Sequence, residues 1–137
     1  MDSVADDELL ARYIFHSGYI RSSDKTVKQN AFIPPNNLEL SVTRHINFTE
    51  DDIWSMGKNA ATHRKLPLYG RADVKTEYVK KQNLEVRPQP IRNHPDVGDN
   101  PNHANIVNWP LEKNDRKMIA LEIANASHFT ANPEMGV

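Results

Sequence analysis

The chain has 137 residues, the size of one ordinary domain, and 38% hydrophobic with 26% charged residues is typical of a globular protein. The formal net charge of -1 provides no overall field that would recruit nucleic acid or an acidic membrane. Because cysteine is absent, disulfides, thiolate zinc sites and cysteine nucleophiles are excluded.

Neither a secretory signal nor a membrane span is predicted. Residues 1–10 are acidic and lack the positive start and apolar run of a signal peptide. No stretch approaches the roughly 18 apolar residues that a bilayer-spanning helix needs. We therefore expect a cytoplasmic protein that forms a single domain over residues 1–137.

The first half of the chain predicts a helix followed by two strands. Apolar residues at helical spacing predict the helix over residues 7–15. Alternation of apolar and polar residues predicts strands at 27–31 and 38–42, because successive side chains of a strand point to opposite faces. The prolines and asparagines of segment 34–37 predict a loose turn between these strands.

The clearest local signal is a helix start. Thr49 is a favoured N-cap residue, and Asp52 stands three positions later, where the acid of a capping box belongs. This pair predicts a helix that begins at Glu50. Gly57 is the expected stop.

Beyond this helix the sequence predicts four more elements. These are a short strand at 68–72, a helix at 73–83 capped by Asp73, a short strand at 84–86 and a helix at 115–127. Together the elements predict an α+β fold. We expect a small antiparallel or mixed sheet with three to four helices, arranged in two layers and packed mainly on one side of the sheet.

Two segments, 87–110 and 128–137, are predicted to be largely irregular. Residues 87–110 are rich in proline and asparagine, and a loop of this length in a compact domain usually has a function. Within residues 87–110, only 106–109 are predicted to form a strand. Residues 128–137 are expected to form a frayed tail.

The long loop contains the residue types that bind metals. His94, Asp96, Asp99 and His103 lie within ten positions of one another. No recognised metal-binding spacing accompanies them, so a polar surface loop that bonds its own backbone is the favoured interpretation. We predict no metal site and no cofactor.

The function favoured by the sequence is that of a small binding or adaptor protein. It would present the 87–110 loop to a protein partner or an anionic ligand, with Trp109 as the anchor, because tryptophan and arginine dominate interface energetics. The other predicted contact residues share a polar or charged side chain that could hold such a ligand; they are Arg71, Asp73, Arg92 and Asn105.

The alternative function is enzymatic. His103 would act as a base together with His94 or His45, in a hydrolase, phosphodiesterase or nuclease that holds its substrate with arginines. Arg12 and His16, one turn apart on the predicted first helix, would face such an anion together.

Segment 58–92 is basic, with nine lysines and arginines against three acidic residues. It offers a route to nucleic acid through phosphate contacts. An ordinary lysine-rich solvated face is the favoured interpretation, because aromatic residues make up only 7% of the chain and no RNA-binding signature is present.

Overall fold

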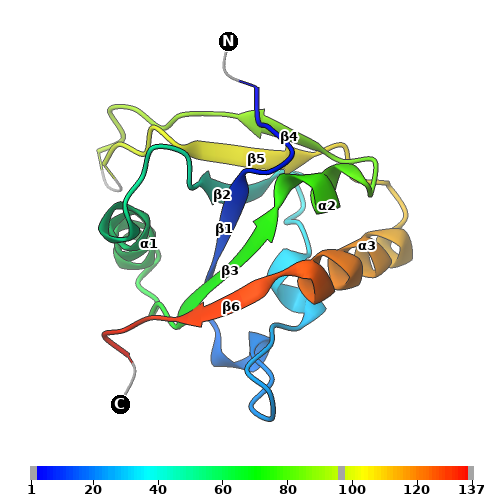
Figure 1. Ribbon diagram of the computed structural model, residues 1–137, viewed down its shortest axis with the longest axis horizontal. Coiled ribbons are helices and arrows are strands. Elements are labelled where there is room, and N and C mark those ends of the chain that lie inside the picture. The colour runs from blue at the N-terminus through cyan, green and yellow to red at the C-terminus, as the bar shows by residue number, and fades with distance from the viewer. Residues whose placement is uncertain (1–2, 96–97, 136–137) are drawn as a thin grey trace.

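The computed structural model describes residues 3–95 and 98–135, and one antiparallel sheet forms its centre (Figure 1). The sheet has six strands in the order β4-β5-β2-β1-β3-β6. The strands are β1 (Leu9–Ile14), β2 (Leu40–Arg44), β3 (Gly70–Lys75), β4 (Glu85–Pro88), β5 (His103–Val107) and β6 (His128–Ala131).

Helices lie on both faces of this sheet. The described residues form three α-helices, α1 (Glu50–Arg64), α2 (Thr76–Lys80) and α3 (Lys113–Ala126), and two 3-10 turns, η1 (Ser17–Tyr19) and η2 (Gln29–Phe32). Figure 1 shows α1 on one face and α2 and α3 on the other. The predicted α+β class is therefore confirmed, but the sheet is larger than expected and the helices do not share one side. None of the helices in the described ranges is long and apolar enough to cross a membrane.

The two faces of the sheet differ in chemistry. The face toward α3 and η2 carries the main apolar core, which includes Leu10, Ile14, Leu40, Ala72, Val74, Ile106, Phe32 and Ile123. Because side chains alternate along a strand, the intervening residues point toward α1. Several of these are polar, among them Tyr13, Ser41, Thr43, Arg71, Asp73 and His103. The polar face is the one on which a site can form.

The predicted first helix and first strand are both wrong. Residues 9–14 form β1, which lies between β2 and β3 in the middle of the sheet. A central strand covered on both faces buries consecutive apolar residues, and this removes the strict alternation that identifies a strand. Residues 29–32 form the 3-10 turn η2, whose Ala31 and Phe32 are buried against the core.

The predicted start of α1 is confirmed. The amide of Asp52 donates to Thr49 Oγ1 at 3.1 Å, and the amide of Thr49 donates to Asp52 Oδ2 at 3.0 Å. The predicted end is wrong, because the helix continues to Arg64. Gly57 serves close packing instead: a β-carbon there would lie 2.7 Å from Cε1 of Tyr13.

The remaining predictions are partly met. The strand predicted at 68–72 is displaced to β3, which contains Asp73, so Asp73 caps no helix and only the five residues of α2 are helical. The strand at 84–86 agrees with β4, and the helix at 115–127 with α3. Long-range pairing with β2 and β4 makes residues 103–107 a strand, so the irregular part of the 87–110 loop is shorter than expected.

The expected frayed tail is ordered where it begins. Residues 128–131 form β6 and pair with β3 at the edge of the sheet. The side chain of Asn132, just beyond, donates a buried hydrogen bond of 2.9 Å to the carbonyl of Leu68. This segment is ordered because it pairs with β3, which is distant in the sequence. A prediction from local sequence cannot identify such a partner.

The capping box yields a stability prediction. Replacing Thr49 by Ala removes the acceptor for the Asp52 amide, and we expect a loss of about 1 kcal/mol in the free energy of unfolding. Thr49→Ser keeps the hydroxyl and is expected to remain within a few tenths of wild type. Urea denaturation measures both variants. Equal midpoints for Thr49→Ala and wild type would contradict the cap.

Candidate functional site

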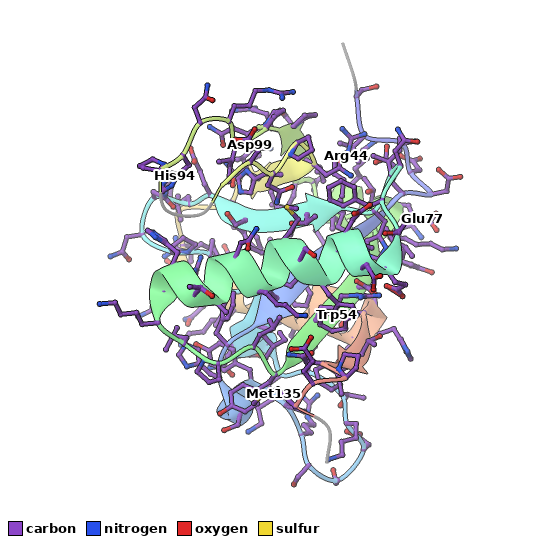
Figure 2. The ribbon with its side chains drawn as sticks, turned by 90° about the vertical axis from the view of Figure 1, so that its left-hand side faces the viewer. Arg44, Trp54, Glu77, His94, Asp99 and Met135 are labelled. Carbon is purple, nitrogen blue, oxygen red and sulfur yellow. The ribbon has the colours of Figure 1, made fainter. Side chains whose placement is uncertain are left out.

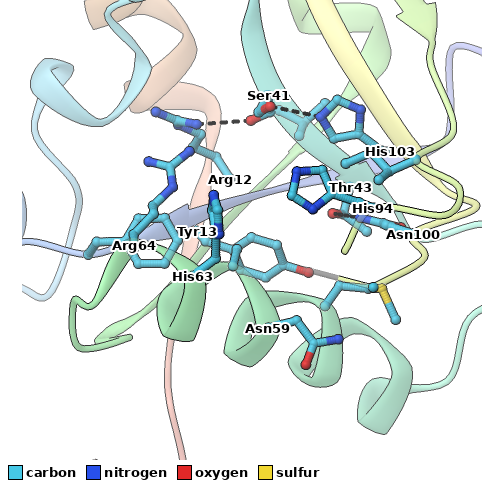
Figure 3. Close-up of a pocket in the computed structure, with 16 residues that line it drawn as sticks. Arg12, Tyr13, Ser41, Thr43, Asn59, His63, Arg64, His94, Asn100 and His103 are labelled. Carbon is cyan, nitrogen blue, oxygen red and sulfur yellow. Dashed lines mark hydrogen bonds between the residues drawn. The ribbon is translucent and has the colours of Figure 1, made fainter. Parts of the chain in front are cut away.

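A cavity of about 230 Å³ lies between α1 and the polar face of the sheet (Figure 3). Its walls come from β1, β2, the start of β5, the C-terminal half of α1 and the loop between β4 and β5, which carries His94 and Asp99 alongside the helix (Figure 2). The polar and ionisable lining residues are Arg12, Tyr13, Ser41, Thr43, Asn59, His63, Arg64, His94, Asn100 and His103. No residue in this lining, as far as the chain is described, is a carboxylate.

Arg12 is the most unusual of these side chains. Its Nε donates to the carbonyl of Ala31 at 2.8 Å, and its Nη1 donates to the carbonyl of Ser41 at 3.0 Å. Over the described residues no carboxylate pairs with it. Burial and then the nearby Arg64 lower the pKa of Arg12 to about 10. The guanidinium is thus desolvated and repelled by a second cation.

Arg64 supplies that second charge from the last turn of α1. Its guanidinium carbon lies 4.9 Å from the centre of the Phe15 ring, a cation–π contact that directs the exposed side chain along the wall of the cavity. Figure 3 shows Arg12 and Arg64 side by side at one end of the cavity.

Two histidines connect α1 to the β4–β5 loop. The rings of His63 and His94 meet edge to face, with centroids 5.4 Å apart and planes at 82°. His63 belongs to α1 and His94 to the loop, so this contact helps to set the position of the loop over the cavity.

Ser41 and His103 form a hydrogen-bonded pair beside Arg12, whose Nη1 bonds the carbonyl of Ser41. Ser41 Oγ lies 2.7 Å from Nε2 of His103, and Nδ1 of His103 lies 2.8 Å from the carbonyl oxygen of Gln89. A carbonyl oxygen can only accept, so Nδ1 carries the hydrogen. Burial lowers the pKa of His103, although the Gln89 carbonyl and Glu39 oppose this shift. In the neutral ring Nε2 is therefore the acceptor, and the Ser41 hydroxyl donates to it.

The structure brings together His94 and His103, two of the three histidines predicted to act as a base. His45 does not join them. Its Nε2 lies 2.9 Å from Oδ1 of Asp73, and it is absent from the cavity wall. The reason is positional: His45 follows β2 and lies near the start of α1, whereas the cavity lies beside the end of that helix.

Arg71 and Asp73, both predicted to contact a ligand or partner, lie on one face of β3 and pair with each other, with Nε of Arg71 3.0 Å from Oδ2 of Asp73. They are not available to a ligand, because Arg71 is only 3% exposed under α1. Its Nη2 also contacts Glu50 at 2.8 Å, and its guanidinium stacks 4.7 Å from the Trp54 ring. Burial alone would lower the pKa of Arg71, but Glu50 and Asp73 outweigh burial and raise it. Through Glu50 and Trp54, Arg71 fastens α1 to β3.

Trp109 is also structural. It is 5% exposed, and its Nε1 donates to the carbonyl of Ile106 at 2.9 Å. The expectation of an exposed anchor is therefore wrong, because the indole completes the core at the end of β5. Arg92 and Asn105 instead line a second, open groove beyond His103, and the side chain of Asn105 bonds that of Gln89.

The basic segment 58–92 does not form one continuous surface. Arg64 faces the cavity, Arg71 is buried, and Lys80 on α2 pairs with Asp6 at 2.9 Å. Folding distributes these charges over both faces of the sheet, because the segment runs from α1 through β3 to β4.

The sequence does not predict Ser41 as a site residue, nor the closeness of Arg12 and Arg64. Arg12 was expected to join His16 on a helix, but residue 12 is in β1 and lies beside a residue 52 positions away. Ser41 occupies a polar position of a correctly predicted strand. That alternation was the available signal, since it marks Ser41 and Thr43 as facing away from the apolar core.

The metal-ligand cluster considered for the loop is not supported by the described residues. No three His, Asp or Glu side chains within 3–95 and 98–135 are placed so that they could hold a metal ion. Asp96, one member of that cluster, lies outside the described residues. Comparison with known proteins adds no further information, since no family model, curated protein or solved structure matches the chain.

The burial of Trp109 predicts a large stability cost for its removal. Trp109→Ala leaves a cavity in the core, and we expect the free energy of unfolding to fall by about 3–5 kcal/mol. Trp109→Phe keeps most of the ring and is expected to cost less. Urea denaturation of both variants measures the difference. An alanine variant as stable as wild type would contradict a core role.

The lowered pKa of His103 predicts a pH dependence of stability. Between the folded-state pKa and the ordinary value of about 6.5, the unfolded chain binds more protons than the folded protein. The free energy of unfolding therefore falls as the pH drops from about 6.5 through the folded-state pKa. His103→Gln should show a smaller fall between pH 7 and pH 5. The exposed His128→Gln is the control, and equal slopes in both variants would refute the assignment.

Proposed function

We propose that the protein binds a small phosphate-bearing molecule in the cavity between α1 and the sheet. The proposal favours the enzymatic alternative over an adaptor, because the adaptor depended on an exposed Trp109, and that side chain is buried. It is supported by His94 and His103, which share one concave site with Arg12 and Arg64.

One observation carries the proposal: the charge of Arg12 is not compensated by a carboxylate anywhere in the described chain. A desolvated guanidinium that bonds only carbonyl oxygens is costly, and a bound anion would offset that cost. Repulsion from the neighbouring Arg64 raises the free-energy cost of the Arg12 charge. An anion bound between them would be attracted by both arginines.

Phosphate suits these donors better than a single-point anion. A guanidinium carries planar N–H donors that match the oxygens of phosphate, and two guanidinium groups line this cavity, Arg12 from β1 and Arg64 from α1. Asn59 and Asn100 add amide groups to the same wall, with Nδ2 of Asn100 held 3.1 Å from the hydroxyl of Thr43. A cavity of about 230 Å³ accommodates a phosphate with a small organic group, so the ligand is a small molecule.

Calorimetric titration tests the proposal with inorganic phosphate and phenyl phosphate at constant ionic strength. We expect both to bind wild type and to raise its melting temperature, because ligands of the folded state stabilise it. Arg64→Gln removes one exposed charge without touching the core, and we expect at least a roughly tenfold weaker affinity, equivalent to about 1.4 kcal/mol.

Lys117→Gln is the charge-matched control, because Lys117 is exposed on α3 across the sheet from the cavity. It should bind phosphate like wild type. The proposal is refuted by a wild-type protein that binds neither phosphate probe. Equal affinity losses in Arg64→Gln and Lys117→Gln would refute it too, because they would indicate non-specific charge attraction.

A further inference from the structure

We propose that Ser41 is a nucleophile and His103 its general base, and that together they cleave small phosphate monoesters through a phosphoserine intermediate. This inference rests on the phosphate pocket proposed above. It adds a chemical step and assigns that step to two atoms, Oγ of Ser41 and Nε2 of His103.

The hydrogen-bond chain has the order that an activated serine requires. The hydroxyl of Ser41 donates to Nε2 of His103 at 2.7 Å, and Nδ1–H of His103 donates to the Gln89 carbonyl at 2.8 Å. A base within hydrogen-bond reach of the nucleophile, oriented by a third group, is the general arrangement for nucleophilic catalysis. The lowered pKa of His103 agrees with a neutral ring that is able to accept the proton.

The orienting group is itself fixed by the sheet. The amide of Gln89 donates to the carbonyl of His103 at 2.9 Å, which extends the pairing of β4 and β5 by one residue. Gln89 and His103 are thus joined by two hydrogen bonds, one between their backbones and one from the His103 ring to the Gln89 carbonyl. Ser41 is on β2, the other neighbour of β5, so both reacting groups are on rigid strands.

Ser41 and His103 lie at the boundary between the cavity and the open groove. Ser41 and His103 line the arginine-bearing cavity and also the open groove formed with Asn37, Glu39 and Gln89. A phosphoryl group held by the arginines would therefore reach Ser41 from one side. The alcohol part of the ester would have the open groove, or the cavity beside His94, as its exit.

The position of Arg12 favours phosphoryl transfer over acyl transfer. Its Nη1 bonds the backbone carbonyl of Ser41 at 3.0 Å, so a cation is tied to the nucleophilic residue itself (Figure 3). In phosphoryl transfer the reacting group carries negative charge throughout, and catalysis consists mostly of positioning and electrostatic stabilisation of that charge. Arg12 and Arg64 are suited to that task.

The proposed reaction balances without a metal or a redox partner. Ser41 Oγ forms a bond to phosphorus while the bond between phosphorus and the ester oxygen breaks. The hydroxyl proton passes to His103 Nε2 and then, through water, to the departing alkoxide. In the second step His103 deprotonates a water that attacks the phosphoserine. Inorganic phosphate leaves, and Oγ regains a proton from His103.

The decisive experiment combines turnover of 4-nitrophenyl phosphate with acid-quenched mass spectrometry of the whole protein. Wild type should release nitrophenolate and carry one added phosphoryl group on the peptide that contains Ser41. Ser41→Ala should lose turnover to the uncatalysed background and carry no phosphoryl group, yet still bind phosphate. His103→Gln should lower kcat by roughly 10²–10⁴-fold, the usual effect of removing a general base.

Matched controls are available on the same chain. Ser55→Ala on the exposed side of α1 and His128→Gln on β6 replace the same residue types outside the cavity and should turn over like wild type. Turnover that persists in Ser41→Ala overturns the inference, as does a wild type that binds phosphate but shows neither turnover nor a phosphoryl adduct. Absence of phosphate binding would instead refute the proposed function, so the two failures are distinguishable.

Discussion

The cavity depends on how α1 is held against the sheet, and one buried guanidinium joins the first turns of that helix to β3. Arg71 on β3 bonds Asp73 on its own strand and Glu50 in the first turn of α1, and its charge lies against the Trp54 ring. The hydroxyl of Tyr13 adds a 2.5 Å hydrogen bond to the carbonyl of Ile53. These large side chains hold the N-terminal half of the helix. The cavity lies under the other half, where the lining includes the smaller Asn59 and Ala60.

The strands supply the floor of the site by simple alternation. On β2, Leu40 and Val42 enter the apolar core, whereas Ser41 and Thr43 face α1. β2 therefore stabilises the protein with one set of side chains and lines the cavity with the other. A sheet floor also positions reacting groups more rigidly than a loop does, because the backbone ladder fixes every second side chain.

Arg12 links stability to the proposed chemistry. Its hydrogen bonds to the carbonyls of Ala31 and Ser41 tie β1 to η2 and β2, so the side chain closes the end of the core. Both partners are neutral carbonyls, and its charge therefore remains available to an anion. In the Arg71 network, by contrast, Asp73 and Glu50 bond the guanidinium through Nε and Nη2, and the charge is used within the fold. Arg12 bonds neutral carbonyls and can attract an anion, whereas Arg71 bonds carboxylates and stabilises the fold.

Local sequence alone determined the α+β class, strand β2, the capping box at Thr49 and helix α3, because each is marked by the spacing of residues a few positions apart. Only the tertiary structure decided that residues 9–14 form a strand, since β2 and β3 pair along its two edges while α1 and η2 cover its faces. The same holds for the site. Ser41 bonds His103, which is 62 positions away, and Arg12 lies beside Arg64, which is 52 positions away. No short-range pattern encodes such pairs, because the sheet order that brings them together is fixed by long-range pairing and by the burial of the whole core.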